Sequence, residues 1–342
     1  MRDKRGTRWA NAWRAAKSLV FVPISDGRAT RVAWSQYTAY LMSDTPRTEL
    51  PPTLDPVASA RWATWLHERS PWLNEEVARR MEDRLQWIRL QPKRWIDWSP
   101  LSGGVDNHAA VRARYPKAHC HVVETSPQRV ARVRQLIQAP WWKRWFRPEM
   151  LSFDAPAAGT ADMLWANMAL HTAHDPQALL QKWHQLLAVD GFLMFSCLGP
   201  DTLRELNHVY ESMGWSPACH AFTDMHDWGD MLVHAGFAEP VMDMERLTLT
   251  YDSPESLLAE FRALGRNLHR HRFAGLRGKT WRKQLETALL HLAKTEQDGR
   301  LTLTVEVIYG HALKPLPRLK MTGESTVSLQ DMRTLLGQSL SG

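Results

Sequence analysis

The sequence predicts an α/β fold in which helices cover both faces of a largely parallel sheet. The expected strands are 94–98, 119–124, 162–167 and 191–197. Helices are expected between them, at about 106–115, 127–138 and 175–188. Strands that alternate with helices in this way are typically parallel and joined by right-handed crossovers. The loops that follow these strands therefore lie at one edge of the sheet, where open α/β sheets bind ligands.

Two further helices are expected before the first strand. Asp55 and Pro56 provide an N-cap and a proline at the first helical position, so one helix begins there. The candidates for its buried side are Val57, Ala60, Trp62 and Trp65. A second helix, from residue 73 or 74 to 88, has an apolar face that consists of Val77, Met81, Leu85 and Ile88.

A second group of elements follows the strand at 191–197. A helix over 224–235 stops at Gly236, a typical C-terminal glycine. The elements expected after it are a strand at 240–251, a helix capped by Ser253, a helix at about 279–294 and a strand at 301–313. We interpret the insertion at 252–298 as a helical lid over the ligand edge of the sheet.

Small and polar residues follow three of the expected strands. Gly103 and Gly104 form a turn in the first loop, where a backbone without side chains can approach a cofactor closely. Glu124 ends the second strand, twenty residues after Gly104, as a carboxylate that binds ribose hydroxyls would. Asn167 follows the third of these strands and offers its amide or a neighbouring carbonyl. Order and spacing together predict a site for a nucleoside cofactor.

Each of these residues also has a structural alternative. Glu124 could cap the helix that begins near Pro127, and Asn167 could satisfy a turn. Doubled glycines such as Gly103 and Gly104 are common in loops of every kind. The hypothesis of a nucleoside cofactor site therefore rests on these residues taken together and not on any one of them.

The charge of the chain is concentrated at its beginning. The net charge is +7 over 342 residues, and residues 1–41 account for +6 of it. The rest is nearly neutral, so the high pI does not indicate nucleic-acid binding. We expect 1–54 to be a basic, disordered extension, 55–315 the folded domain and 316–342 a flexible tail. Residues 1–41 have neither sustained periodicity nor the layout of a secretory signal. We favour a translation start at Met42 over an Arg-rich targeting sequence.

The cysteines and histidines indicate neither disulfides nor a metal. Three widely spaced cysteines, Cys120, Cys197 and Cys219, fit a reducing cytoplasm. The pairs His119 with His121 and His269 with His271 lack further ligands at metal-binding spacing, so no metal is expected. No apolar run is long enough to cross a membrane. We therefore expect a cytoplasmic monomer that binds neither membrane nor nucleic acid.

The chain resembles the class I methyltransferases that use S-adenosylmethionine (SAM). Within them it is most similar to the biotin-synthesis branch, the malonyl-[acyl-carrier protein] O-methyltransferases (BioC). The resemblance covers about 55–315 and rests on five segments: 164–171 (LWANMALH), 190–196 (DGFLMFS), 222–230 (FTDMHDWGD), 242–245 (MDME) and 264–267 (LGRN).

The resemblance implies a seven-stranded, mostly parallel sheet with one antiparallel strand near its edge. It implies transfer of the SAM methyl group to the free carboxylate of a malonyl group on acyl-carrier protein, which masks that charge for chain elongation. The cofactor-binding positions that it implies are Asp97, Gly103, Gly104, Glu124, Asp154 and Asn167, with Asp154 the nearest candidate for the adenine amino group. No catalytic acid or base is expected.

The first loop departs from the family pattern, an acidic residue followed by three alternating glycines. Asp97 matches the acid and Gly103 the third glycine, but Ser99 and Leu101 replace the other two. We expect Leu101 to crowd the methionine end of the cofactor unless the loop takes another path. This departure supports an alternative, a non-catalytic methyltransferase fold that binds a carrier protein or another enzyme.

A basic stretch in the lid fits both hypotheses. Between residues 262 and 283 there are eight Lys or Arg residues and no acidic residue. Acyl-carrier proteins are acidic, so a cationic lid would steer their approach. The candidates for binding the carrier or its acyl carboxylate are Arg262, Arg266, Arg270 and Arg272. A solvated basic face is the structural alternative, and RNA binding is a third, which lacks the usual stacking platform.

Overall fold

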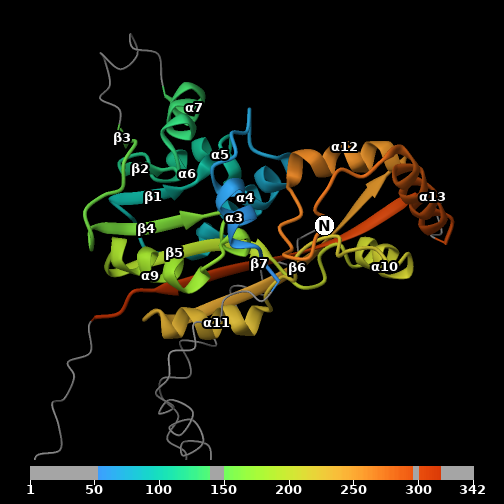
Figure 1. Cartoon of the computed structure of the whole chain (residues 1–342). Coiled ribbons are helices and arrows are strands. Elements are labelled where there is room, and N and C mark those ends of the chain that lie inside the picture. Colours follow the sequence, from blue (N-terminus) through green and yellow to red (C-terminus); the bar gives the residue numbers. More distant parts are fainter. Residues whose placement is uncertain (1–52, 139–149, 296–299, 317–342) are drawn as a thin grey trace, which may run out of the picture.

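A seven-stranded sheet forms the centre of the molecule in the computed structural model, which describes residues 53–138, 150–295 and 300–316 (Figure 1). Its spatial order is β3-β2-β1-β4-β5-β7-β6. The strands are β1 (Arg94–Trp98), β2 (His119–Val123), β3 (Leu151–Ser152), β4 (Ala161–Ala166), β5 (Leu187–Leu198), β6 (Ala238–Tyr251) and β7 (Leu301–Leu313). Only β7 is antiparallel to its neighbours within this sheet. The predicted class I methyltransferase fold is confirmed.

Helices cover both faces of this sheet. The helices are α3 (Pro56–Ala63), α4 (Trp72–Arg84), α5 (Pro100–Gly103), α6 (His108–Arg114), α7 (Pro127–Ile137), α9 (Pro176–Leu186), α10 (Arg204–Ser212), α11 (Met225–His234), α12 (Pro254–Leu264) and α13 (Lys279–Thr295). Alternate residues of one strand enter opposite cores, as the pleat requires: Trp95 packs with α4, α6 and α7, and Ile96 packs with α9 and α11.

The two last strands extend beyond the rest of the sheet. Pairing of β5 with β7 ends at Leu198 and Val307, but β6 and β7 stay paired as far as Tyr251 and Leu301. We call this projecting part of β6 and β7, with α10, α12 and α13, the arm. A separate apolar core holds it together, formed by Leu206, Leu257, Leu285, Leu289 and Leu303 among others. Figure 1 shows the arm projecting from one edge of the sheet, so the insertion predicted as a lid belongs to it.

The structure confirms the predicted strands and most helices to within a few residues, with one correction. The side of α3 predicted to be buried is largely exposed: Val57 is 57% and Trp65 47% exposed, and Ala60 is exposed too. Trp62 is half-buried, and the residue of α3 that is buried is Ser59, whose hydroxyl donates to the Thr172 carbonyl at 2.6 Å. The reason is that α3 does not pack on either sheet core.

Three elements were not predicted, and the two terminal segments remain untested. β3, α5 and α10 are too short or too polar to stand out by periodicity. The proposed extension at 1–54 and tail at 316–342 lie outside the described residues, apart from 53–54 and 316. Among the helices described, none is long and apolar enough to cross a membrane.

Gly310 of β7 gives a sharp test of the packing between β5, β7 and β6. A Cβ at this position would overlap the Phe195 ring and lie 2.9 Å from the Met242 sulfur. We expect Gly310→Ala to lower the free energy of unfolding by about 1–3 kcal/mol in urea titrations, because the core must be overpacked. The matched control is Gly229→Ala in α11, where an added Cβ meets nothing within 4 Å. It should be neutral or stabilising, and equal losses in both variants would contradict this account.

Because His311 of β7 is buried, we predict that the folded protein loses stability in acid. The His311 side chain is buried beside Phe192, with ring centroids 5.5 Å apart, and burial lowers its pKa to about 4. In the unfolded chain a histidine titrates near its ordinary pKa of about 6.5. Between these values the unfolded state binds the extra proton, so stability is complete above pH 6.5 and falls as the pH decreases toward 4.

The measurement is urea unfolding at pH 7 and pH 5 for the wild type and for His311→Leu. The wild type should lose about 2 kcal/mol more than the variant over this interval. Other buried histidines contribute equally to both proteins. Parallel pH profiles would show that His311 is not neutral and buried in the folded state.

Candidate functional site

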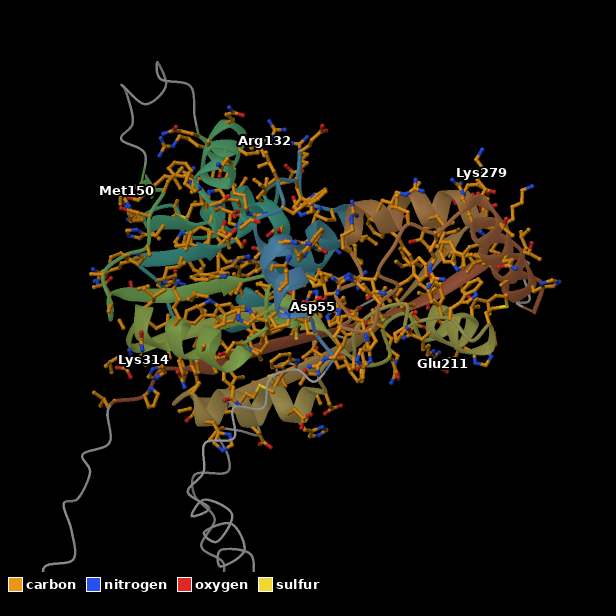
Figure 2. The ribbon with its side chains drawn as sticks, in the orientation of Figure 1. Asp55, Arg132, Met150, Glu211, Lys279 and Lys314 are labelled. Carbon is orange, nitrogen blue, oxygen red and sulfur yellow. The ribbon has the colours of Figure 1, made fainter. Side chains whose placement is uncertain are left out.

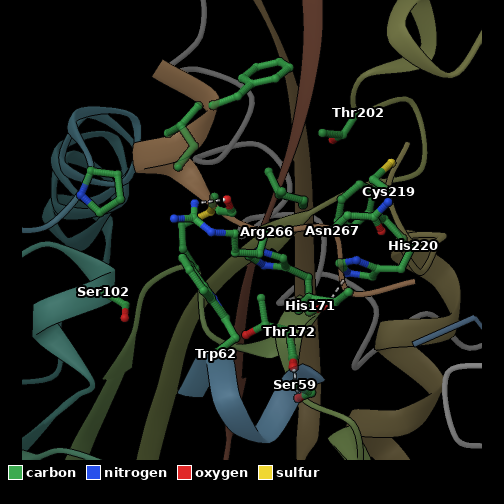
Figure 3. A pocket seen from close by; sticks show the side chains of 18 of the residues that line it. Ser59, Trp62, Ser102, His171, Thr172, Thr202, Cys219, His220, Arg266 and Asn267 are labelled. Carbon is green, nitrogen blue, oxygen red and sulfur yellow. Dashed lines mark hydrogen bonds between the residues drawn. The ribbon is translucent and has the colours of Figure 1, made fainter. Parts of the chain in front are cut away.

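A cavity of about 1060 Å³ lies between the carboxyl ends of the parallel strands and the arm. Trp98 and Ser99 at the end of β1, Thr125 after β2, and Asn167 and Met168 after β4 line one side of it. Residues of α3, α12 and α13 line the other sides. Figure 3 shows Trp62, His171, His220 and Arg266 around this space. Small-molecule sites occupy up to roughly 1,000 Å³, so its size suits a nucleoside cofactor and part of a second ligand.

The first loop takes the other path that the sequence analysis left open. Ser99 adopts a left-handed conformation with φ 55°, and Pro100 then begins the short helix α5. Leu101 turns into the apolar core below α4 and is fully buried there. It does not line the cavity. The expected crowding of the cofactor by Leu101 is therefore absent from this structure.

Gly103 and Asn167 hold the first loop against the loop after β4. A Cβ on Gly103 would lie 2.7 Å from the Asn167 carbonyl oxygen, so this close approach requires glycine. The Asn167 amide donates to the carbonyls of Asn74, at 2.7 Å, and of Gly103. Its oxygen accepts from the Ser196 hydroxyl at 2.5 Å. All its polar atoms thus have protein partners, although Asn167 borders the cavity.

Glu124 is buried in an ion pair with Arg129. Glu124 Oε2 lies 2.6 Å from Arg129 Nε, and the two side chains are 0% and 1% exposed. Oε1 accepts from the Leu101 amide at 2.8 Å, and Oε2 also accepts from the Ser99 hydroxyl at 3.3 Å. Burial raises the pKa of Glu124, and Arg129 acts in the opposite direction. Glu124 is not among the described residues that line the cavity.

Arg129 uses its remaining donors on the first loop and on the segment after α3. Nη2 donates to the hydroxyls of Ser102 at 2.8 Å and Ser99 at 3.2 Å, and Nη1 donates to the Trp65 carbonyl at 2.5 Å. Because Ser99 and Ser102 border the cavity and neither Glu124 nor Arg129 does, the ion pair lies behind these two serines. Sequence reasoning missed this residue. A signal was available: Arg129 is in the first turn of α7, where the helix dipole disfavours a cation unless a carboxylate pairs with it.

The other predicted acids also point elsewhere. Asp97 is buried with its Oδ2 2.6 Å from Nδ1 of His108, which is buried too. The Asp154 side chain is 75% exposed, and its Oδ1 lies 3.5 Å from Nδ1 of His121. Neither acid lines the cavity, nor do Gly103 and Gly104. Of the six predicted cofactor positions, the structure brings only Asn167 to the cavity wall.

The lid arginines divide into two pairs. Arg262 and Arg266 line the cavity, whereas Arg270 and Arg272 do not. Arg272 is held outside it by Asp55, 2.5 Å away at the junction of sheet and arm (Figure 2). Three further cations line the cavity without having been singled out: Lys182, Arg277 and Arg282. Arg277 and Arg282 belong to the basic stretch at 262–283, and Arg282 is paired with Glu286 at 2.7 Å, whereas the fold brings Lys182 from a distant part of the chain.

The wall of the cavity is therefore strongly cationic. Its one carboxylate among the described residues is Asp175, which caps α9 by accepting from the Ala178 amide at 2.8 Å. Burial lowers the pKa of His67 to about 4 and that of His171 to about 3, so both rings are neutral near pH 7. Arg277 lies against the rings of Phe273 and Trp281, with centroids 4.4 Å and 4.5 Å away. Such a wall is complementary to an anionic ligand.

Comparisons with known proteins agree with this geometry. A family model described as a methyltransferase domain matches residues 65–239. The malonyl-[acyl-carrier protein] O-methyltransferase of Laribacter hongkongensis is 39% identical over 269 residues, covering 76% of this chain and 89% of the relative. This chain belongs to that methyltransferase family. The enzyme of the same name from Gallionella capsiferriformans is 38% identical over 270 residues, covering 76% and 90%.

Solved structures resemble this family member more distantly. The YcgJ protein of Bacillus subtilis has a TM-score of 0.47 at 15% identity, covering 71% of this chain and 99% of that one. The relatives' names support the catalytic interpretation, and nothing in the comparisons favours the non-catalytic alternative. Among the residues that the structure describes, no group of three metal-binding side chains occurs.

Asn167 offers a test that separates a structural from a cofactor-binding role. We expect Asn167→Ala to lower the free energy of unfolding by about 2–4 kcal/mol, because it leaves buried polar groups of Asn74, Gly103 and Ser196 without partners. Ser196→Ala, which removes only one of these hydrogen bonds, is the matched control and should cost less. Urea unfolding measures both. Unchanged stability with reduced cofactor affinity would instead assign Asn167 to the cofactor.

Proposed function

We propose that this chain transfers the methyl group of SAM to the free carboxylate of malonyl-acyl-carrier protein, the substrate named for its relatives. The observation that carries the proposal is the cavity, which lies at the ligand edge of a class I sheet and has a cationic wall. Five cations line it: Lys182, Arg262, Arg266, Arg277 and Arg282. A malonyl carboxylate supplies the complementary charge.

The cavity fits SAM in place and in volume, with one exception. Ser99, Ser102, Thr125 and the Asn167 loop border the space where a nucleoside would bind. The exception is Glu124, whose oxygens are already bonded within the protein. When bound, SAM supplies an electrophilic methyl group on a sulfonium. The cofactor roles of Asp97, Gly103, Gly104, Glu124, Asp154 and Asn167 stay predictions.

The contribution of the protein is to align the acceptor and to exclude water. A carboxylate is ionised near neutral pH, so it needs no general base. Arg262 and Arg266 would bind and orient the acyl carboxylate, since arginine pairs with carboxylates through parallel hydrogen bonds. The low pKa values of His67 and His171 keep further charge out of the cavity near pH 7. The arm covers this space and would limit competing hydrolysis.

The carrier protein would dock on the basic outer surface of the arm. Figure 2 shows Lys279 at the far end of the arm, and Arg270 is exposed where its amide donates to the Thr53 carbonyl at 2.8 Å. Attraction between this surface and an acidic carrier would raise the association rate at low salt. Arg272 would contribute less because Asp55 already neutralises it.

The direct test is methyl transfer from SAM to purified malonyl-acyl-carrier protein, with the methyl ester detected by mass spectrometry. Replacing Arg262 and Arg266 together by glutamine should lower kcat/KM about 10–100-fold, since a charge-assisted hydrogen bond contributes roughly 1.5–3 kcal/mol. Lys117→Gln is the control, because this exposed lysine precedes β2 at the opposite edge of the sheet. Absence of any methyl ester from wild-type protein would overturn the proposed function.

A further inference from the structure

Arg129 is paired with Glu124, the carboxylate that a nucleoside cofactor would be expected to use. We propose that Arg129 is a latch: SAM and the guanidinium compete for Glu124, so the affinity for the cofactor is set by the displacement of Arg129. This inference rests on the proposed function, because it concerns the cofactor of the same site. It makes Arg129 a positioning residue, which acts on the cofactor through Glu124.

The Arg129 guanidinium is held in place by several hydrogen bonds to the protein. Its nitrogen atoms donate to four acceptors, the Glu124 carboxylate, the hydroxyls of Ser99 and Ser102, and the Trp65 carbonyl, at 2.5–3.2 Å. Both Glu124 and Arg129 are closed off from solvent. A ribose could bond to Glu124 only by replacing its protein partners, because the carboxylate is closed off from solvent and its Oε2 is already paired with the guanidinium.

The first loop is adapted to this arrangement. Ser99 carries a hydroxyl at a left-handed position where glycine is the unstrained residue, and that hydroxyl contacts both partners of the ion pair. Ser102 supplies a second acceptor from the same loop. The two positions that the sequence analysis identified as departures, Ser99 and Leu101, are thus both bonded to Glu124, one by its hydroxyl and one by its amide.

Electrostatics explain why the latch is closed without a ligand. A cation in the first turn of α7 is unfavourable by itself, and a buried carboxylate is unfavourable by itself. Pairing offsets part of both penalties, although burial still raises the pKa of Glu124, so the free protein keeps the pair closed. The carboxylate expected to bind the ribose is thus already paired with a cation and closed off from solvent. Cofactor affinity should therefore be low for the wild type.

The test is calorimetric titration of SAM and of its demethylated product into the wild type and into Arg129→Met. Methionine has a similar reach without charge, and it leaves Glu124 free to bind the ribose. We expect at least a tenfold gain in affinity for both ligands. Arg129→Lys is the matched control: it keeps a cation beside Glu124 and should bind no tighter than the wild type. If Arg129 had a purely structural role, its replacement would not increase the affinity for either ligand.

A second variant covers the case in which Arg129→Met does not fold. Ser99→Gly combined with Ser102→Ala removes two acceptors of the guanidinium and keeps the ion pair, and it should tighten SAM binding several-fold. Equal or weaker binding by the folded variant, or no binding by any of these proteins, would overturn the latch. A variant that gains SAM affinity but forms no methyl ester would support the latch and count against the proposed function, so the two failures are distinguishable.

Discussion

The buried ion pair between Glu124 and Arg129 determines how the ligand edge of this protein is built. A buried pair is tolerated only when its remaining donors and acceptors are satisfied. Here the first loop, the end of β2 and the segment after α3 supply those partners. The Leu101 amide donates to Glu124 at the start of α5. The Leu101 side chain then lies in the core. The loop thus remains compact although it lacks two of the expected glycines.

The same edge combines two electrostatic environments. Beneath the cavity, polar groups are paired and closed off from water, as in the ion pair of Glu124 with Arg129 and the hydrogen bond between Asp97 and His108. On the cavity wall, Lys182 and several lid arginines face a space with a single described carboxylate. Paired charges give little field outside themselves, whereas unbalanced cations attract anions. The wall is therefore suited to an anionic ligand, and the paired groups beneath it provide the rigid support.

Periodicity was sufficient for most of the fold and insufficient for most of the site. Strands such as β1 and β4 are short, mostly apolar segments, and the caps at Asp55 and Ser253 are local signals, so both could be predicted. The buried side of α3 was predicted wrongly because an apolar face was assumed to pack on the sheet, whereas α3 covers the cavity. The position of Glu124 could be predicted, but its partner was missed, because a cation in the first turn of α7 is a local signal that does not show which carboxylate it pairs with until the fold encloses it.

Arg129 also connects the two ends of the site physically. Its guanidinium holds the Trp65 carbonyl, and the Trp65 ring lies 5.0 Å from the guanidinium of Arg266, which lines the cavity from the lid. A movement of Arg129 therefore removes the support of Trp65 and changes the contact made by Arg266. Coupling between sites requires an element with two discrete arrangements that both ligands bias. A guanidinium that is either paired with Glu124 or released from it is such an element. Under the proposed latch, the contacts through Trp65 would connect Arg266 on the cavity wall to the same equilibrium.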